Sequence, residues 1–168
     1  MLDIKYIKEK ESLISKLEDF NSLRELVGSN KTSGVYFKQT ADFDLEGSAD
    51  NLWTPIGSEA NNFQGIYDGG NHVIKNMWIS TNGYAGFFAF VKSATIKNLT
   101  FEGGCVNASS VSYVGALVGR SLSDVTIENV SNIGCDIVGK NNHIGGIIGN
   151  YYGDATHAIK IISCANSG

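Results

Sequence analysis

The sequence predicts an all-β fold, a parallel β-helix with coils of about thirty residues, together with an N-terminal helical cap. The first observation is a glycine-containing phrase that occurs three times, as YAGFFAF (84–90), YVGALVG (113–119) and HIGGIIG (143–149). A second phrase accompanies the first along the chain, as VIKNM (73–77), TIKNL (95–99) and TIENV (126–130), with a less regular last copy at 159–164. Two phrases in phase indicate one coil per period, because a coil buries its apolar residues only when a neighbour stacks on it.

The composition agrees with a folded chain that turns many times. The 168 residues include 20 glycines and 1 proline, and 42% of them are hydrophobic, which excludes a disordered protein. This length allows one continuous core rather than two independent ones. The predicted division is therefore a helical cap over residues 1–28 and β-helix repeats over residues 29–168.

Residues 1–28 predict an amphipathic helix. The segment is rich in Lys and Glu, and its apolar residues have helical spacing, at Leu13, Leu17, Phe20, Leu23 and Val27. Gly28 follows as a natural helix stop. We expect this helix to cover the first coil, whose backbone edge would otherwise be open to pairing with another chain.

Short strands are expected in order along the rest of the chain. Residues 34–45 alternate apolar and polar side chains around a turn at 40–42, and residues 53–57 and 63–69 continue as short strands between Gly, Asn and Asp. Beyond Val73 the period predicts three short strands per coil, each pairing with its counterpart one coil later. Asn76, Asn98 and Asn129 hold the same place in the second phrase, which predicts a ladder of side-chain amides at one corner.

Charge and cysteine usage exclude several classes of protein. The net charge is −4 and the arginines are Arg24 and Arg120, so no basic stripe is present and nucleic-acid binding is not expected. Cys105 and Cys135 lie one period apart and are expected to stack as small apolar residues, not to belong to a disulfide framework. No apolar run has the length of a membrane span, so membrane insertion is not expected.

The first residues do not show the pattern of a secretion signal. Two locations therefore remain open. The protein is cytoplasmic if Met1 is its natural start, and it belongs to the cell surface or the secreted proteins if the chain was cut from a longer one.

Five segments in a fixed order resemble the bacterial GLUG-motif family: YFKQTADFDL (36–45), WTPIG (53–57), FQGIYDG (63–69), NHVIKN (71–76) and VGALVG (114–119). The resemblance runs from about residue 19 to residue 149. It implies a right-handed parallel β-helix, typically a non-catalytic part of bacterial surface proteins, adhesin-like proteins and the N-terminal regions of immunoglobulin A1-cleaving metallopeptidases. The chain contains no His-Glu-x-x-His zinc motif, so no peptidase activity is expected.

Two groups of charged residues are candidates for chemistry. Asp42, Asp44 and Asp68 could hold calcium, but they are also typical turn residues whose carboxylates accept backbone N–H bonds, and the structural interpretation is favoured. Parallel β-helices also include polysaccharide lyases, and the nearest approach to such a site combines three residues, Arg120, Asp124 and Glu128. We expect no catalytic residues, no cofactor and no metal.

A column of flat side chains is the candidate binding surface. Tyr84, Tyr113 and His143 open the three glycine phrases, and Tyr151 and Tyr152 add to the same end. If the column faces outward, it predicts contact with a protein or a glycan, whereas an inward column would be core. The predicted function is a non-catalytic module that binds another protein. The alternatives are a cytoplasmic inhibitor of a host protein, encoded by a phage or mobile element, and a polysaccharide-binding or lyase-like β-helix.

The last apolar segment predicts an assembly surface. Ile159, Ile161, Ile162 and Cys164 would lie on a final coil with an unpaired backbone edge. We expect this end to dock against a second copy end to end or against the natural partner, and a two-fold dimer is the commonest closed arrangement.

Overall fold

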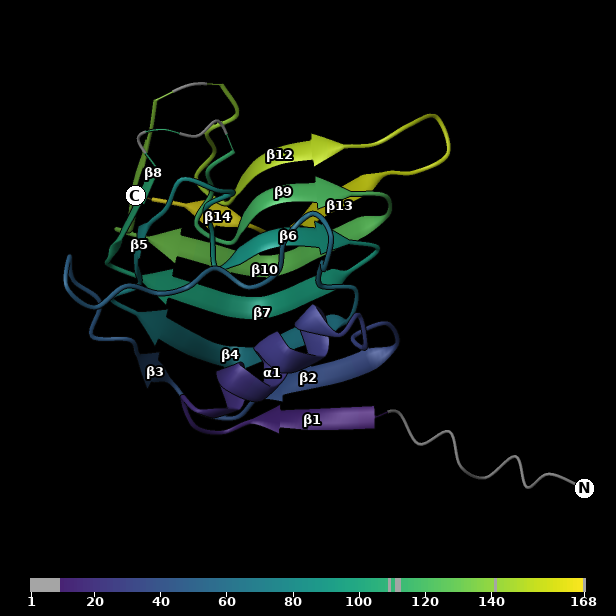
Figure 1. The fold of residues 1–168 in the computed structure, drawn as a ribbon, viewed down its shortest axis with the longest axis horizontal. Coiled ribbons are helices and arrows are strands. Elements are labelled where there is room, and N and C mark those ends of the chain that lie inside the picture. The colour runs from purple at the N-terminus through teal and green to yellow at the C-terminus, as the bar shows by residue number, and fades with distance from the viewer. Residues whose placement is uncertain (1–9, 109, 111–112, 141, 168) are drawn as a thin grey trace, which may run out of the picture.

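The computed structural model confirms the predicted all-β parallel β-helix (Figure 1). It describes residues 10–108, 110, 113–140 and 142–167. Three successive coils, over residues 66–92, 95–122 and 125–152, each contribute one strand to each of three sheets, and the strands pair in parallel with their counterparts one coil away. The longest sheet runs in the order β1 (Lys10–Ile14), β2 (Val35–Gln39), β4 (Ile66–Lys75), β7 (Thr95–Glu102), β10 (Val125–Ile133) and β13 (Ile159–Ile162).

Two further sheets close the coils. One contains β5 (Trp78–Ser80), β8 (Cys105–Ala108) and β11 (Asp136–Gly139), and the other contains β6 (Phe88–Lys92), β9 (Val118–Leu122) and β12 (Ile148–Tyr152). The short strands β3 (Phe43–Asp44) and β14 (Ala165–Asn166) pair with the far ends of β4 and β10. In Figure 1 the strands of the longest sheet are stacked from β1 at the bottom to β13 near the top.

The N-terminal segment is not one continuous helix. Residues 1–9 of the predicted cap lie outside the described residues, and residues 10–14 form β1, which pairs in parallel with β2. The helical interpretation of Leu13 and Leu17 is wrong, since both side chains are exposed and Leu13 lies in a strand. The physical reason is that pairing with β2 satisfies the backbone groups of this segment and buries Ile14, which overrides the helical spacing.

The helix itself is shorter and has a different role from the one predicted. It is α1 (Asp19–Gly28), and it ends at the predicted stop. The Phe20 ring lies with its centroid 5.3 Å from that of Phe43, 5.2 Å from that of Trp53 and 5.6 Å from that of Phe87. The helix therefore fills the apolar interior of the first coil, while β1, not the helix, forms the edge of the longest sheet within the described chain (Figure 1).

The predicted ladder of asparagines exists with one different member. The Asn129 amide donates to Oδ1 of Asn98 at 3.0 Å and to Oδ1 of Asn71 at 3.2 Å. The inclusion of Asn76 is wrong, since its amide donates to both carboxylate oxygens of Asp44 at 3.0 Å. The reason is that the copy of the second phrase at 73–77 lies beyond this corner, since residues 66–68 pair with 95–97 and Val73 pairs with Thr100.

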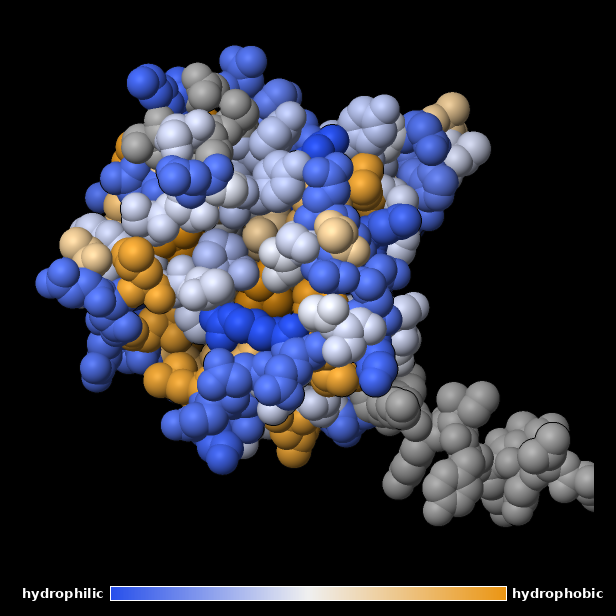
Figure 2. All heavy atoms as spheres, viewed as in Figure 1, coloured by the Kyte–Doolittle hydropathy of each residue, from blue (hydrophilic) through white to orange (hydrophobic). Residues whose placement is uncertain are grey.

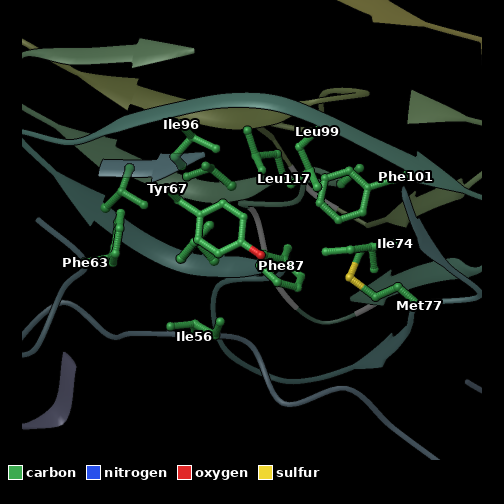
Figure 3. Close-up of a cluster of buried hydrophobic side chains, with 14 of the residues drawn as sticks. Ile56, Phe63, Tyr67, Ile74, Met77, Phe87, Ile96, Leu99, Phe101 and Leu117 are labelled. Carbon is green, nitrogen blue, oxygen red and sulfur yellow. The ribbon is translucent and has the colours of Figure 1, made fainter. Parts of the chain in front are cut away.

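The core is a continuous stack of aromatic and aliphatic side chains (Figure 3). Tyr67 aligns with Ile96, which aligns with Ile127, and all three are fully buried. The Tyr67 hydroxyl donates to Oε1 of Gln39 at 2.9 Å, so this buried polar group is satisfied. Leu117, whose orientation the sequence left open, is fully buried in the same cluster.

The glycines of the first phrase are required by close backbone approach. A Cβ added to Gly115 would lie 2.7 Å from the carbonyl oxygens of Ile147 and Val118, and one added to Gly119 would lie 2.8 Å from the Ala85 nitrogen. Carbon atoms do not approach backbone atoms this closely without a shift of the chain. The repeated glycines therefore mark places where neighbouring coils meet backbone to backbone.

Substitution of Leu117 by Asp should prevent folding. An unpaired charge in this position costs several kcal/mol, against a total stability of about 5–15 kcal/mol. Circular dichroism and urea denaturation of the Leu117→Asp variant measure the loss. Leu52→Asp is the matched control, since Leu52 is exposed, and a soluble Leu117→Asp variant with an unchanged spectrum would contradict the core assignment.

Truncation of Phe20 tests whether α1 belongs to the core. Phe20→Ala removes a fully buried ring with three aromatic neighbours and should lower the free energy of unfolding by about 3–5 kcal/mol. Leu17→Ala, at an exposed position just before the helix, should change it by less than about 0.5 kcal/mol. Equal small effects in urea denaturation would mean that the helix is not needed to close the first coil.

Candidate functional site

The predicted aromatic column is formed, and it lies at the surface. The Tyr84 and Tyr113 ring centroids are 5.3 Å apart, and the Tyr113 ring stacks on His143 at 4.9 Å with an interplanar angle of 19°. The cause is the parallel pairing of the residues that follow each ring, since Ala85 bridges to Val114 and Val114 to Ile144. Tyr84 and Tyr113 are half-buried and His143 is exposed, so the column presents its outer edge to solvent.

Arg120 lies at the centre of this surface. Its guanidinium carbon is 5.2 Å from the Tyr113 ring centroid, 5.9 Å from that of Tyr84 and 5.7 Å from that of Tyr152. A fourth ring, Phe90, lies at 5.7 Å, in the strand that precedes Arg120 in the sheet. Each of these distances is within the range of a cation–π contact.

One carboxylate completes the site. The Glu59 side chain accepts a hydrogen bond from the Tyr84 hydroxyl at 3.0 Å and lies 3.8 Å from Nη1 of Arg120, which in turn donates to the Tyr84 hydroxyl at 3.3 Å. Nε of Arg120 is buried and finds no acceptor among the described residues. We call these groups the arginine-aromatic site, comprising Glu59, Tyr84, Tyr113, Arg120 and Tyr152.

The two tyrosines predicted beside the column have different surroundings. Tyr152 is exposed and contacts Arg120, as described above. Tyr151 is the residue before Tyr152 in the same strand, so its side chain points to the other face, in register with the buried Ser121. Burial and the nearby carboxylates of Asp124 and Asp154 raise the pKa of Tyr151. Tyr151 is therefore not part of the arginine-aromatic site.

Within the described part of the chain, no hydrogen bond or ion pair joins the candidate catalytic residues Arg120, Asp124 and Glu128 to one another. Asp124 accepts a hydrogen bond from the Ala158 backbone N–H at 3.0 Å, which fixes the chain before β13, while Arg120 pairs with Glu59 instead. Glu59 was missed by the sequence reasoning because it lies in a loop outside both repeated phrases. Only the three-dimensional path of that loop brings it to Arg120.

The three aspartates considered for calcium are occupied as hydrogen-bond acceptors. Asp42 Oδ1 accepts from the Val73 backbone at 3.0 Å and lies 3.0 Å from Nδ1 of His72, while Asp44 accepts from Asn76 and from the Glu46 backbone at 2.8 Å. In the described part of the chain, no group of three or more His, Cys, Asp or Glu side chains is placed to hold a metal ion.

Asp68 is the most buried of the three. Burial raises its pKa, but hydrogen bonds from the Tyr36 hydroxyl, the Asn98 amide and the Gly70 N–H, together with the Lys97 ammonium at 3.6 Å, outweigh burial and lower the pKa below 3.8. The carboxylate thereby ties β2, β4 and β7 together on the outer face of the longest sheet. Asp68 is a structural residue of the solenoid.

The residues predicted for assembly lie on the last coil. Ile159 and Cys164 are half-buried, and Ile161 and Ile162 are exposed. Cys105, Cys135 and Cys164 are free thiols. Cys135 is fully buried, and burial raises its pKa to about 12, so this thiol behaves as a core residue.

The comparisons with known proteins give two relatives, of which the chain spans only small parts. The chain is 30% identical over 131 residues to a Gly-rich membrane protein of Evansella cellulosilytica, covering 74% of this chain and 14% of that protein. It is 27% identical over 149 residues to Halomucin of Haloquadratum walsbyi, covering 83% of this chain and 2% of that protein. No family model matches the chain, and no solved structure matches it significantly. Membership of the GLUG-motif family stays a prediction.

The described residues contain no helix that is long and apolar enough to cross a membrane. The face that carries α1 shows hydrophilic side chains interrupted by small separate apolar patches (Figure 2). A broad apolar surface is therefore not visible on this face.

The pH dependence of stability should report on Asp68. Because folding lowers its pKa, the stabilisation is present in full above the ordinary value of 3.8 and is lost as the pH falls through the lower folded value. Asp68→Asn should be less stable than the wild type at pH 7, and this difference should shrink toward pH 3 in urea denaturation. The exposed Asp50 is the control, and an Asp68→Asn effect that does not vary with pH would contradict this role.

Proposed function

We propose that the protein is a non-catalytic β-solenoid module of a surface-type protein that binds another protein through the arginine-aromatic site. The observation that carries the proposal is the guanidinium of Arg120 surrounded by four aromatic rings, with one exposed carboxylate beside it. Arg and Tyr are the residue types in which the binding energy of protein interfaces concentrates.

The site is suited to an acidic group of a partner. The Glu59 side chain is 65% exposed and that of Arg120 is 20% exposed, so their contact is at the edge of water and contributes about 0–1 kcal/mol. A carboxylate of the partner can replace Glu59 at low cost and make a bidentate contact with the guanidinium. The rings hold the guanidinium in place beforehand, which lowers the entropy lost on binding.

The contacts of the candidate catalytic residues also favour binding without catalysis. Of the residues considered for catalysis, Asp124 accepts the Ala158 backbone N–H and Arg120 pairs with Glu59. A general acid and base must both reach the reacting group of a substrate. This supports a binding function over polysaccharide cleavage.

The surface-type assignment is supported by the names and lengths of the relatives. One is named a membrane protein and the other Halomucin, and the chain spans 14% and 2% of their lengths. Such proportions are typical of a module that serves within a larger protein. The cytoplasmic inhibitor remains the alternative, and it would use a binding surface of the same kind.

Selection of peptides on the protein tests the proposal. A displayed library of random peptides is selected on the wild type, and the enriched peptides should contain Asp or Glu beside apolar residues. Arg120→Ala and Tyr113→Ala should weaken their binding by about tenfold or more, while Lys160→Ala, an exposed lysine on β13, should not. Circular dichroism confirms that each variant is folded.

Two outcomes would contradict the proposal. Enriched peptides that bind Arg120→Ala as well as the wild type would place binding elsewhere. Binding of acidic glycans on an array that is lost in Arg120→Ala would favour a polysaccharide-binding function. Release of unsaturated or reducing ends from acidic glycans incubated with the protein would favour a lyase-like function.

A further inference from the structure

Arg24 is a second arginine that lies over an aromatic ring. Its guanidinium carbon is 4.2 Å from the centroid of the Trp53 ring, and Trp53 stacks in turn on Phe87, with ring centroids 4.9 Å apart and an interplanar angle of 8°. Unlike Arg120, which pairs with Glu59, Arg24 makes no ion pair with a carboxylate of the described residues. Burial lowers the pKa of Arg24, so this charge has lost part of its hydration without gaining an anionic partner in that part of the chain.

The Arg24 guanidinium is only partly used as a hydrogen-bond donor. Nη2 donates to the Thr54 carbonyl oxygen at 2.9 Å, and Nη1 donates to Oδ1 of Asn21 at the long distance of 3.4 Å. Nε is buried and has no acceptor among the described residues. Because each terminal nitrogen of a guanidinium carries two N–H groups, one N–H on Nη1 and one on Nη2 are left for a ligand.

A pocket of about 210 Å³ lies beside this guanidinium, between α1 and the loop at residues 55–61. Val27 of α1 and Pro55 of the loop are apolar walls next to Arg24. No acidic side chain is among the described residues that line the pocket. Pockets for drug-sized ligands measure about 300–1,000 Å³, so this smaller pocket suits one small chemical group.

The loop adds N–H donors to the lining of the pocket. The Ile56 carbonyl accepts the Ala89 N–H of β6, and a trans peptide places its C=O and N–H on opposite sides, so the Gly57 N–H points away from β6. Gly57 and Asn61 line the pocket, and neither the Gly57 N–H nor the Asn61 amide nitrogen has an acceptor among the described residues. Asn61 is held in place because its Oδ1 accepts from the Asn30 amide at 2.9 Å. These donors and the guanidinium suit an anion.

We propose that this pocket binds one carboxylate group on a short apolar stem, with the carboxylate on Arg24 and the Gly57 N–H and the stem between Val27 and Pro55. A planar carboxylate accepts two N–H groups of a guanidinium at once. Arg24 is the one charged residue of the described lining, so it balances a single negative charge but not a doubly charged phosphate. Such a group occurs at the end of a Glu side chain and in free short-chain acids. The pocket is separate from the arginine-aromatic site and does not rest on the function proposed for it.

Propionate is the probe, because it consists of this group alone. In ¹H–¹⁵N NMR spectra at constant ionic strength, propionate should shift the signals of the Gly57 N–H and of Trp53 Nε1–H, with a Kd of about 1–10 mM. Propionamide, which has the same shape without the charge, should leave both signals in place. Arg24→Gln should weaken propionate binding by about tenfold or more, whereas Lys31→Gln, which removes an exposed charge just after α1, should not.

Four results would overturn the proposal: an equal shift with propionamide, an unchanged shift in a folded Arg24→Gln variant, tighter binding of inorganic phosphate than of propionate, or loss of the Gly57 shift in Arg120→Ala. The last variant separates the two sites, since it should abolish binding at the arginine-aromatic site and leave the pocket unchanged. N-acetylglutamate methylamide distinguishes the two sources of the group. Binding as tight as that of propionate would assign the pocket to a Glu side chain, and binding at least about tenfold weaker would assign it to a free acid.

Discussion

Parallel stacking of each coil on its predecessor is the constraint on which the rest of the structure depends. Each buried residue of the longest sheet is covered by its counterpart one coil away, as Tyr67 is by Ile96 and Ile96 by Ile127. This register needs corners that repeat without drift, and left-handed residues provide them, with φ of 62° at Asn71, 55° at Asn98 and 51° at Asn129. The amide ladder then links the corners of successive coils.

The same stacking produces the candidate site on the outside. A repeat that aligns core residues also aligns the residues just before each strand, so Tyr84, Tyr113 and His143 form a column without any separate device. The charged groups beside the column come from positions that depart from the repeat. Arg120 stands where the preceding coil has Phe90, and the irregular loop with Glu59 supplies the carboxylate.

The sequence predicted the features that repeat and missed those that do not. The coils and the aromatic column follow from phrases in phase, since periodic burial is a local signal. The strand at 10–14 was missed because its pairing partner β2 is distant in sequence, while its spacing also fits a helix. Asn76 was misplaced because the phrase at 73–77 resembles the phrase at 95–99 in sequence but pairs with the residues after it, as Val73 does with Thr100. No local pattern marks the pairing of Arg120 with Glu59.

The sides and the interior of a solenoid are subject to different physical demands. A side chain on a side, such as that of Arg120, can reach water because its strand β9 pairs with β6 on one side and with β12 on the other. In the interior of the first coil, by contrast, apolar side chains must be covered, and the Phe20 ring of α1 provides that cover. The arginine-aromatic site and the core therefore place separate demands on the sequence, and residues of the site can change while the coils keep their register.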